Sequence, residues 1–155
     1  MERAVDDGIN SFKALTKDPR TLAAGGAAEI AVARALKDFG ARQPGLQQYS
    51  ISAFADALEV VPRTIAENSG LDATTAVSAL HAAHAAGNAH AGLDVATGEA
   101  KDLGAEGLTD LYLTKWWALK LAADAVATVL RVDQIIMAKQ AGGPKPKQQS
   151  GWDEE

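Results

Sequence analysis

The sequence predicts a mainly α-helical fold in which a small β-hairpin interrupts the helices. Three observations support this: apolar residues recur at helical spacing in several segments, alanine supplies much of the 47% hydrophobic content, and aromatic residues make up only 5%. Alanine is the strongest helix former, and a core that is rich in it depends on many small contacts. A chain of 155 residues has the size of one ordinary domain.

Charge and cysteine content exclude several classes of partner and site. The net charge is -5, whereas binding to nucleic acid or to an anionic membrane surface needs clustered lysine and arginine. The chain has no cysteine, which excludes disulfides and thiolate metal sites. The opening "MERAVDDG" carries no apolar signal core, and no stretch holds eighteen consecutive apolar residues. We therefore expect a cytoplasmic protein with neither nucleic acid nor membrane among its partners.

Residues 2–17 are predicted to form an amphipathic helix, which "KDPR" ends. Its apolar positions recur at spacings of four, three and three: Val5, Ile9, Phe12 and Leu15. A turn at "AAGGAAE" then leads into a second helix over residues 30–39, with Gly40 as its stop signal. This second helix is apolar on two sides, which indicates that more than one neighbour covers it.

Two further helices are predicted in the middle of the chain. Residues 44–68 carry a helical apolar face, and Pro62 is expected to bend or break the helix because proline lacks an amide hydrogen. Either Asp72 or Thr74 can cap the next helix, which ends near Gly87.

The stretch after residue 90 changes character and is rich in glycine. A Thr97-Gly98 turn between two short runs predicts a small β-hairpin. A long final helix is expected to begin at residue 113 or 114 and to end near residue 132. From residue 139 onward, glycine, proline, lysine and glutamine dominate, which is typical of a flexible tail.

Residue types alone nominate few chemical sites. His81 and His84 have a spacing that allows two imidazoles on one metal, but no carboxylate of the same helix completes a site, so surface histidines are the simpler interpretation. The backbone of "AAGGAAE" can approach an anionic ligand at a helix N-terminus, although a tight turn is the simpler interpretation of the motif alone. Asp6 and Asp7 suit a general base or a metal ligand, yet acidic residues in a first helical turn usually complement the helix dipole.

Longer motifs resemble one known family. "VLRVDQIIMAK", residues 129–139, resembles the ending of group II chaperonin subunits, which carry an "LRIDDxIxAK"-like segment after their last helix. Other landmarks occur in the family's order: "ERAVDDGINSFKAL", "GGAAEI", "PRTIAENSGLD", "GLDV" and "LYLTKWWALKLA". The resemblance covers residues 2 to about 146, and it is to the eukaryotic cytosolic branch of the family.

The resemblance implies a domain organisation. The fold would be the C-terminal part of the helical bundle of a chaperonin equatorial domain, with a small β-hairpin and a short C-terminal strand. Residues 1–20 would be the end of the intermediate domain and its descending helix. Residues 21–138 would be the C-terminal part of the equatorial ATP-binding domain, and residues 139–155 a flexible tail. The strand, at residues 134–139, would pair with other strands at a subunit contact.

The resemblance also assigns catalytic and glycine positions. Asp7 matches the aspartate that in the family orients and activates the water attacking the γ-phosphate of ATP, with Asp6 as the fallback. Such a carboxylate acts by positioning and charge. Gly25 and Gly26 match two of three glycines whose backbone lies against the ribose, and Ala24 stands where the family has the first.

The remaining site residues are implied in the same way. Asp94 in "GLDV" falls on the adenine-side loop, with Val95 as an apolar neighbour of the base. Asp110 in "LTDLYL" matches the acidic residue that binds the ribose hydroxyls, since a carboxylate can accept two hydrogen bonds. The cofactor would be ATP or ADP with Mg²⁺. No metal ligand is expected in this chain, because the family's phosphate and magnesium motif "GDGT" belongs to an earlier part of the subunit and is not in this sequence.

The function implied is that of part of an ATP-dependent chaperonin subunit. It would assist the folding of cytosolic proteins in a hetero-oligomeric double ring, with other chaperonin subunits and unfolded proteins as partners. ATPase activity would belong to the complete subunit, and this chain alone is expected to be inactive. The alternative is a self-standing, non-catalytic helical interaction protein or assembly factor derived from a chaperonin subunit.

Overall fold

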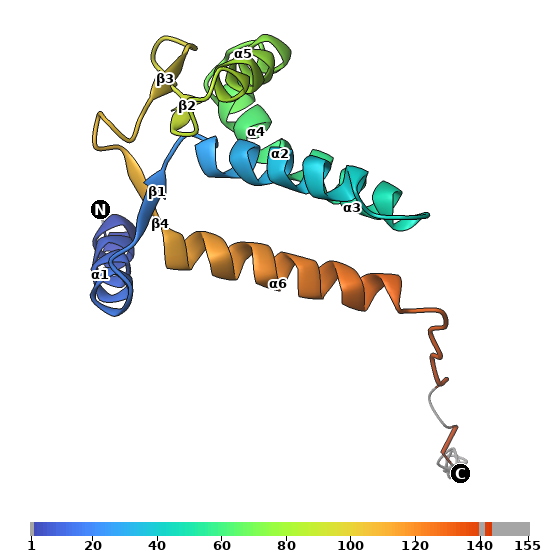
Figure 1. Cartoon of the computed structure of the whole chain (residues 1–155). Coiled ribbons are helices and arrows are strands. Elements are labelled where there is room, and N and C mark those ends of the chain that lie inside the picture. Colours follow the sequence, from blue (N-terminus) through green and yellow to red (C-terminus); the bar gives the residue numbers. More distant parts are fainter. Residues whose placement is uncertain (1, 140–141, 144–155) are drawn as a thin grey trace, which may run out of the picture. The chain divides into compact units, whose positions relative to one another are not determined.

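The computed structural model describes residues 2–139 and 142–143, and it confirms the mainly helical fold class (Figure 1). The described elements, in chain order, are α1 (Glu2–Lys17), β1 (Thr21–Ala23), α2 (Ala27–Ala41), α3 (Gln47–Leu58), α4 (Val60–Asn68), α5 (Ala73–Ala85), β2 (Ala91–Leu93), β3 (Ala100–Asp102), β4 (Thr109–Leu111) and α6 (Tyr112–Leu130). The chain divides into a compact unit that ends at Lys120 and a second unit that begins at Leu121. All packing described below lies within the first unit.

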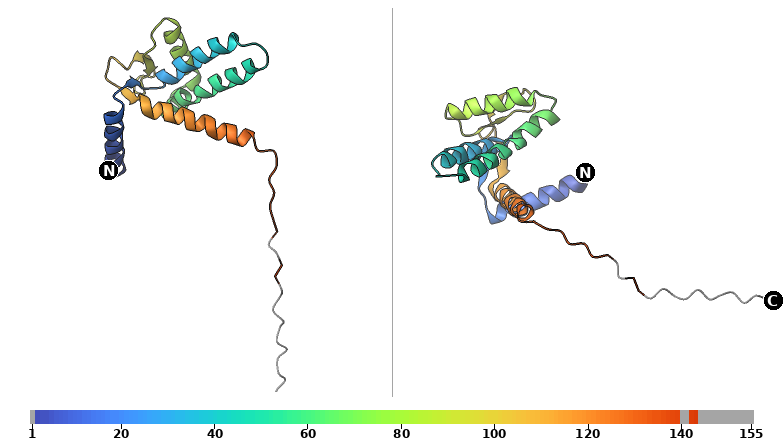
Figure 2. Two further views of the ribbon diagram at one scale, coloured as in Figure 1. Left: turned by 60° about the horizontal axis from the view of Figure 1, so that its bottom comes forward. Right: turned by 90° about the vertical axis from the view of Figure 1, so that its right-hand side faces the viewer.

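The main core lies where α2, α4, α5 and β2 meet. Its buried members are small or medium-sized, as the alanine content predicted: Ile30, Ala66, Ala73, Ala76, Val77, Leu80 and Leu93. A second, smaller cluster joins α2 to α3 through Ala33, Ala55 and Leu58. The two helices run side by side in both views of Figure 2. Helix α2 therefore contributes to both clusters, which explains why two of its sides are apolar.

Gly40 does not stop the second helix, contrary to the sequence-based prediction. Helix α2 continues to Ala41, and Gly40 is buried within its last turn. A Cβ atom at Gly40 would lie 3.0 Å from Cγ2 of Ile51 on α3. The glycine is explained by this close approach of two helices, and a periodicity argument on one helix cannot detect it.

Breaks and caps in the middle of the chain follow the local sequence signals. The expected interruption near Pro62 is confirmed, since α3 ends at Leu58 and α4 begins at Val60. Pro62 occupies the first turn of α4, where its missing amide hydrogen costs nothing. Asp72 is the cap of α5, and its carboxylate accepts hydrogen bonds from the amides of Thr74 and Thr75.

Two small antiparallel strand pairs complete the first unit. Strands β2 and β3 form the predicted hairpin, with Gly92 opposite Lys101. Strands β1 and β4 form a second pair, with Leu22 opposite Asp110, and the sequence analysis did not foresee it. Strands of three residues are too short to show the alternation that identifies a strand. This second pair positions the start of α6 beside Arg20, whose carbonyl oxygen accepts a hydrogen bond from the Tyr112 amide, and Thr109 beside the "AAGG" turn.

The C-terminal part differs from expectation in one respect. Helix α6 ends at Leu130, close to the predicted end, but residues 132–139 form neither helix nor strand. The short strand expected at residues 134–139 is thus not formed in this chain, because a strand needs a partner for its backbone hydrogen bonds. Most of the predicted tail lies outside the described residues. Among the helices that are described, none is long and apolar enough to cross a membrane.

Candidate functional site

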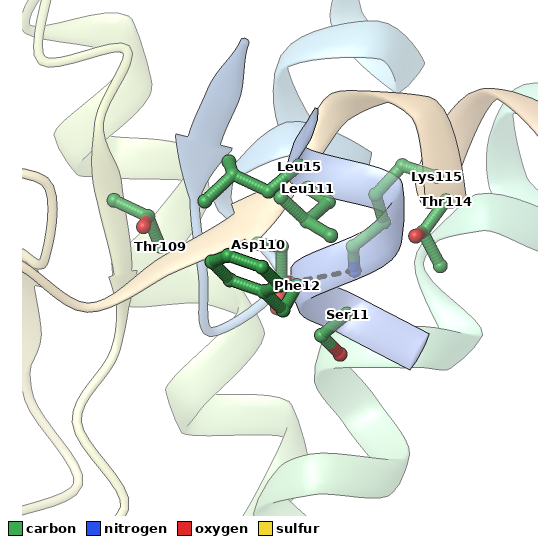
Figure 3. A pocket seen from close by; sticks show the side chains of 8 residues that line it. All are labelled: Ser11, Phe12, Leu15, Thr109, Asp110, Leu111, Thr114 and Lys115. Carbon is green, nitrogen blue, oxygen red and sulfur yellow. Dashed lines mark ion pairs between the residues drawn. The ribbon is translucent and has the colours of Figure 1, made fainter. Parts of the chain in front are cut away.

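A cavity of about 430 Å³ lies between α1 and the junction of β4 with α6 (Figure 3). Its lining combines apolar side chains with hydroxyl and charged groups: Ser11, Phe12, Leu15, Thr109, Asp110, Leu111, Thr114 and Lys115. The dashed line in Figure 3 marks the ion pair between Asp110 and Lys115. Of the residues nominated from the sequence, Asp110 is the one that lines this cavity.

Asp110 is held on β4 by the pairing with β1 and is 41% exposed. Its Oδ2 atom lies 3.1 Å from Nζ of Lys115, in the first turn of α6. The same ammonium group donates a hydrogen bond of 2.5 Å to Oε1 of Glu29 on α2. Partial burial opposes the charge of Lys115, but Glu29 and Asp110 outweigh it, so the pKa of Lys115 is raised. Asp110 therefore offers the cavity a carboxylate with a permanent cationic neighbour.

Asp7 lies on α1, about one helical turn before Ser11 of the cavity lining. It precedes Ser11 by four residues, so the two side chains lie on the same side of the helix. Asp6 precedes Ser11 by five residues and is turned away from it by about 140°. The carboxylate of Asp7 is exposed and does not itself line the cavity. Helix geometry thus favours Asp7 over Asp6 as the residue that faces a ligand there.

Gly25 and Gly26 form the turn before α2, and packing within the chain requires both to be glycine. Both have positive φ, 66° and 80°. A Cβ at Gly25 would lie 2.8 Å from the amide nitrogen of Leu93, and one at Gly26 would lie 2.6 Å from Cβ of Pro62. The carbonyl of Gly25 accepts a hydrogen bond of 2.9 Å from the Leu93 amide. The sequence alone gave no sign that the turn is locked onto β2 and α4.

Asp94 organises the loop of the β2–β3 hairpin. Its carboxylate accepts hydrogen bonds from the Ala96 amide, the Thr97 hydroxyl and the Lys101 ammonium. Lys101 first, and then the other two donors, lower the pKa of Asp94 to about 2. Val95 follows in the same loop and is 54% exposed. Asp94 is therefore already engaged by its own loop, whereas the Val95 side chain is open to a neighbour.

The hairpin loop is expected to lose these bonds only in strong acid. A depressed pKa means that the contribution of Asp94 to stability is complete above its ordinary value of 3.8 and is lost as the pH falls through about 2. In an NMR titration from pH 5 downward, the Ala96 amide signal should shift with a midpoint near 2. Asp94→Asn should abolish that transition. A midpoint near the ordinary value would contradict the hydrogen-bonded turn.

The structure brings the nominated glycines, Asp94 and Asp110 into one connected region. The Gly25 carbonyl bonds to Leu93, the residue before Asp94, and the Ala24 amide bonds to the carbonyl of Leu108, two residues before Asp110. Sequence reasoning missed Glu29 and Lys115. The available signals were the glutamate that ends the "AAGGAAE" turn and the lysine of "LTKWW", and neither indicates a partner.

The two helical histidines have separate structural roles. His84 is buried, contrary to the surface position expected for it, and its Nε2 lies 2.8 Å from the carbonyl oxygen of Ala91. His81 is partly buried, and its Nε2 lies 3.1 Å from Oε1 of Glu59. In the described part of the chain, no group of three or more histidine, aspartate or glutamate residues could hold a metal ion.

Comparisons with known proteins agree on one family. Residues 1–140 match the model of the TCP-1/cpn60 chaperonin family. The whole chain is 52% identical to T-complex protein 1 subunit theta of Bos taurus, 51% to that of Homo sapiens, and 52% to that of Caenorhabditis briggsae. It spans 28–29% of the length of these relatives.

A solved structure supports the same relation. The open-state monomer of a group II chaperonin from Methanococcoides burtonii superposes with a TM-score of 0.77 and 31% identity, over 84% of this chain and 33% of that one. Within the family, the ending with Gln134 and "AGGPKP" resembles the theta subunit of the eukaryotic cytosolic chaperonin TRiC/CCT, and the curated relatives confirm this resemblance. The chain belongs to the TCP-1/cpn60 chaperonin family.

Proposed function

We propose that this chain is part of an ATP-dependent chaperonin subunit that assists the folding of cytosolic proteins. It contributes one side of a nucleotide site and surfaces for ring contacts in a hetero-oligomeric double ring in the cytoplasm. The observation that carries the proposal is the convergence of Gly25, Asp94 and Asp110. These residues match the family's nucleotide motifs, are separated by up to 85 positions, and lie on elements joined by backbone hydrogen bonds.

The proposed domain organisation follows the resemblance. Residues 1–20 are the end of the intermediate domain and its descending helix, and residues 21–138 belong to the equatorial domain. The apolar residues of α1 form a stripe at helical spacing and are nevertheless exposed. This observation supports a contact between α1 and a further segment. The stripe consists of Val5, Ile9, Phe12 and Leu15. An exposed stripe of this kind marks a surface that a partner covers.

Different elements of the site would contact different parts of the nucleotide. Asp110 accepts hydrogen bonds from the ribose hydroxyls, the backbone of Gly25 and Gly26 lies against the sugar, and Val95 contacts the base. Asp7 positions the attacking water and controls charge. The exposed carboxylate of Asp110 at an open cavity fits a sugar hydroxyl. Asp94 fits a different role, that of keeping the loop around Val95 in shape, because its carboxylate already accepts three hydrogen bonds.

Magnesium and the phosphates would be bound mainly by another part of the subunit. The resemblance supports this division, because the family's phosphate and magnesium motif "GDGT" is not in this sequence. Mg²⁺ bound to ATP would neutralise the charge that develops on the phosphates. Within this chain, Asp7 would act on the water and Asp110 on the sugar.

The purified chain is accordingly expected to show no ATP turnover above that of a buffer blank. Phosphate release would be measured on the chain alone and on a reconstituted chaperonin particle whose subunit carries this sequence. Turnover should appear only in the particle. Hydrolysis by the isolated chain that Asp7→Ala abolishes would contradict the proposal of an incomplete site. If the isolated chain is a stable monomer and the particle that carries its sequence also shows no turnover, the alternative of a non-catalytic interaction protein is favoured.

A further inference from the structure

Three charged residues connect the start of α2 to the cavity at β4. Oε1 of Glu29 lies 2.5 Å from Nζ of Lys115, and the same Nζ lies 3.1 Å from Oδ2 of Asp110. Glu29 belongs to the first turn of α2, and Lys115 to the first turn of α6. Lys115 lines the cavity together with Asp110, whereas Glu29 lies behind them and does not reach it. The three side chains thus form a linear chain of two ion pairs with Asp110 at its open end.

Glu29 holds Lys115 firmly because Glu29 is buried. It is only 7% exposed, and its second carboxylate oxygen, Oε2, has no hydrogen-bond partner among the residues that the structure describes. A buried carboxylate needs compensation of its charge, and Lys115 is the cation that the structure places beside it. Any movement of Lys115 away from Glu29 would leave a buried charge without compensation. The ammonium group is therefore fixed in place from the side opposite to the cavity.

Asp110 has no comparable restraint of its own. It lies on a strand of three residues, and the strand pairing fixes its backbone but not the rotation of its carboxylate. The contact with Lys115 engages Oδ2 and so selects one orientation of the group. Lys115 also keeps a positive charge beside a carboxylate that faces solvent.

We propose that Glu29 and Lys115 are positioning residues for nucleotide binding. Lys115 holds Oδ2 of Asp110 so that Oδ1 accepts a hydrogen bond from a ribose hydroxyl, and Glu29 holds Lys115. This inference rests on the proposed function, specifically on the role of Asp110 at the sugar. Neither Glu29 nor Lys115 contacts the sugar, and each acts through the next residue of the chain.

The test compares two nucleotides in a reconstituted chaperonin particle whose subunit carries this sequence. ATP carries the two ribose hydroxyls, and 2′,3′-dideoxy-ATP lacks both. The measured quantity is the ratio of the two affinities at this subunit, obtained by competition against a fluorescent nucleotide while the other sites are inactivated. Asp110→Asn should lower the preference for ATP about 10-fold, since a hydrogen bond to a charged acceptor is lost. Lys115→Met and Glu29→Gln should lower it about 3-fold to 10-fold, with dideoxy-ATP affinity unchanged.

A double variant separates positioning from a general structural role. If Glu29 acts through Lys115, Glu29→Gln combined with Lys115→Met should lower the preference no further than Lys115→Met alone. Lys37→Met is the matched control. Lys37 also bridges two carboxylates, those of Asp56 and Glu59, but outside this cavity. Lys37→Met should leave the preference for ATP over dideoxy-ATP unchanged.

The outcomes distinguish this inference from the proposed function. If Asp110→Asn leaves the preference unchanged, the role of Asp110 at the sugar is wrong and the proposed function fails at this residue. If Asp110→Asn lowers the preference but Lys115→Met and Glu29→Gln do not, the positioning chain is wrong and the proposed function stands. Should Lys115→Met fail to fold, Glu29→Gln, which keeps the size of the side chain, decides the question. An effect of equal size on dideoxy-ATP would also contradict positioning at the sugar.

Discussion

Replacing Asp7 with alanine should lower ATP turnover at this subunit's site about 10²-fold to 10⁴-fold, the usual contribution of a residue that positions or deprotonates a nucleophile. Nucleotide affinity should change little, because the proposed partner of Asp7 is the attacking water and not ATP. The measurement is phosphate release from a reconstituted chaperonin particle in which the corresponding aspartate is replaced in the other subunits. Only the site that contains this chain then turns over.

Asp6→Ala in the same background tests the neighbouring assignment. Asp6 is turned about 140° around α1 from Ser11, which lines the cavity. Its removal should therefore leave most of the turnover intact. Loss of turnover with Asp6→Ala and not with Asp7→Ala would reverse the assignment. Equal loss in both variants would indicate an effect on α1 as a whole, and helical circular dichroism of the two variants would reveal it.

Replacing Gly25 with alanine should lower the free energy of unfolding of this chain by about 2–5 kcal/mol. Two costs add: about 1–2 kcal/mol for a side chain at positive φ, and about 1–3 kcal/mol for overpacking. The second cost arises because the new Cβ would lie 2.8 Å from the Leu93 amide nitrogen and 2.9 Å from its carbonyl oxygen. Those backbone atoms belong to β2 and cannot move without breaking its bond to the turn. Urea titration without nucleotide measures the change.

Gly45→Ala is the matched control for that experiment. Gly45 has a similar backbone conformation, with φ of 77°, but nothing lies within 4 Å of the Cβ that alanine would add. Its cost should be the conformational one alone, about 1–2 kcal/mol. The difference between the two variants isolates the crowding at Gly25. Equal losses would mean that the turn and β2 are not in close contact in solution.

Helices were predictable here because their signals lie within a few residues of one another. The stripe of α1, the break before Pro62 and the cap at Asp72 each depend on neighbours in the sequence, and the structure confirms all three. The hairpin at Thr97-Gly98 was predictable for the same reason. The role of Gly40 was not, because its partner Ile51 lies on another helix.

Site residues were predictable only where a motif resembles a known family. Asp94 illustrates the limit of that approach. The motif "GLDV" nominated it for a nucleotide loop, but the structure shows that its carboxylate accepts bonds from Ala96, Thr97 and Lys101 of its own loop. A motif match identifies the position of a residue in the family. It does not show whether the side chain faces a ligand or its own loop.

Local signals in the amino-acid sequence were sufficient to predict the helices, the cap at Asp72 and the hairpin turn, and longer motifs indicated the family. The three-dimensional packing defined how these parts meet. It placed Leu22 opposite Asp110, locked Gly25 onto Leu93, and brought Glu29 to Lys115 across 86 positions of the chain. The physical reason is that a helix or turn is stabilised by bonds between near neighbours, whereas an ion pair or a two-strand ladder forms only after distant segments have been brought together by burial of their apolar faces.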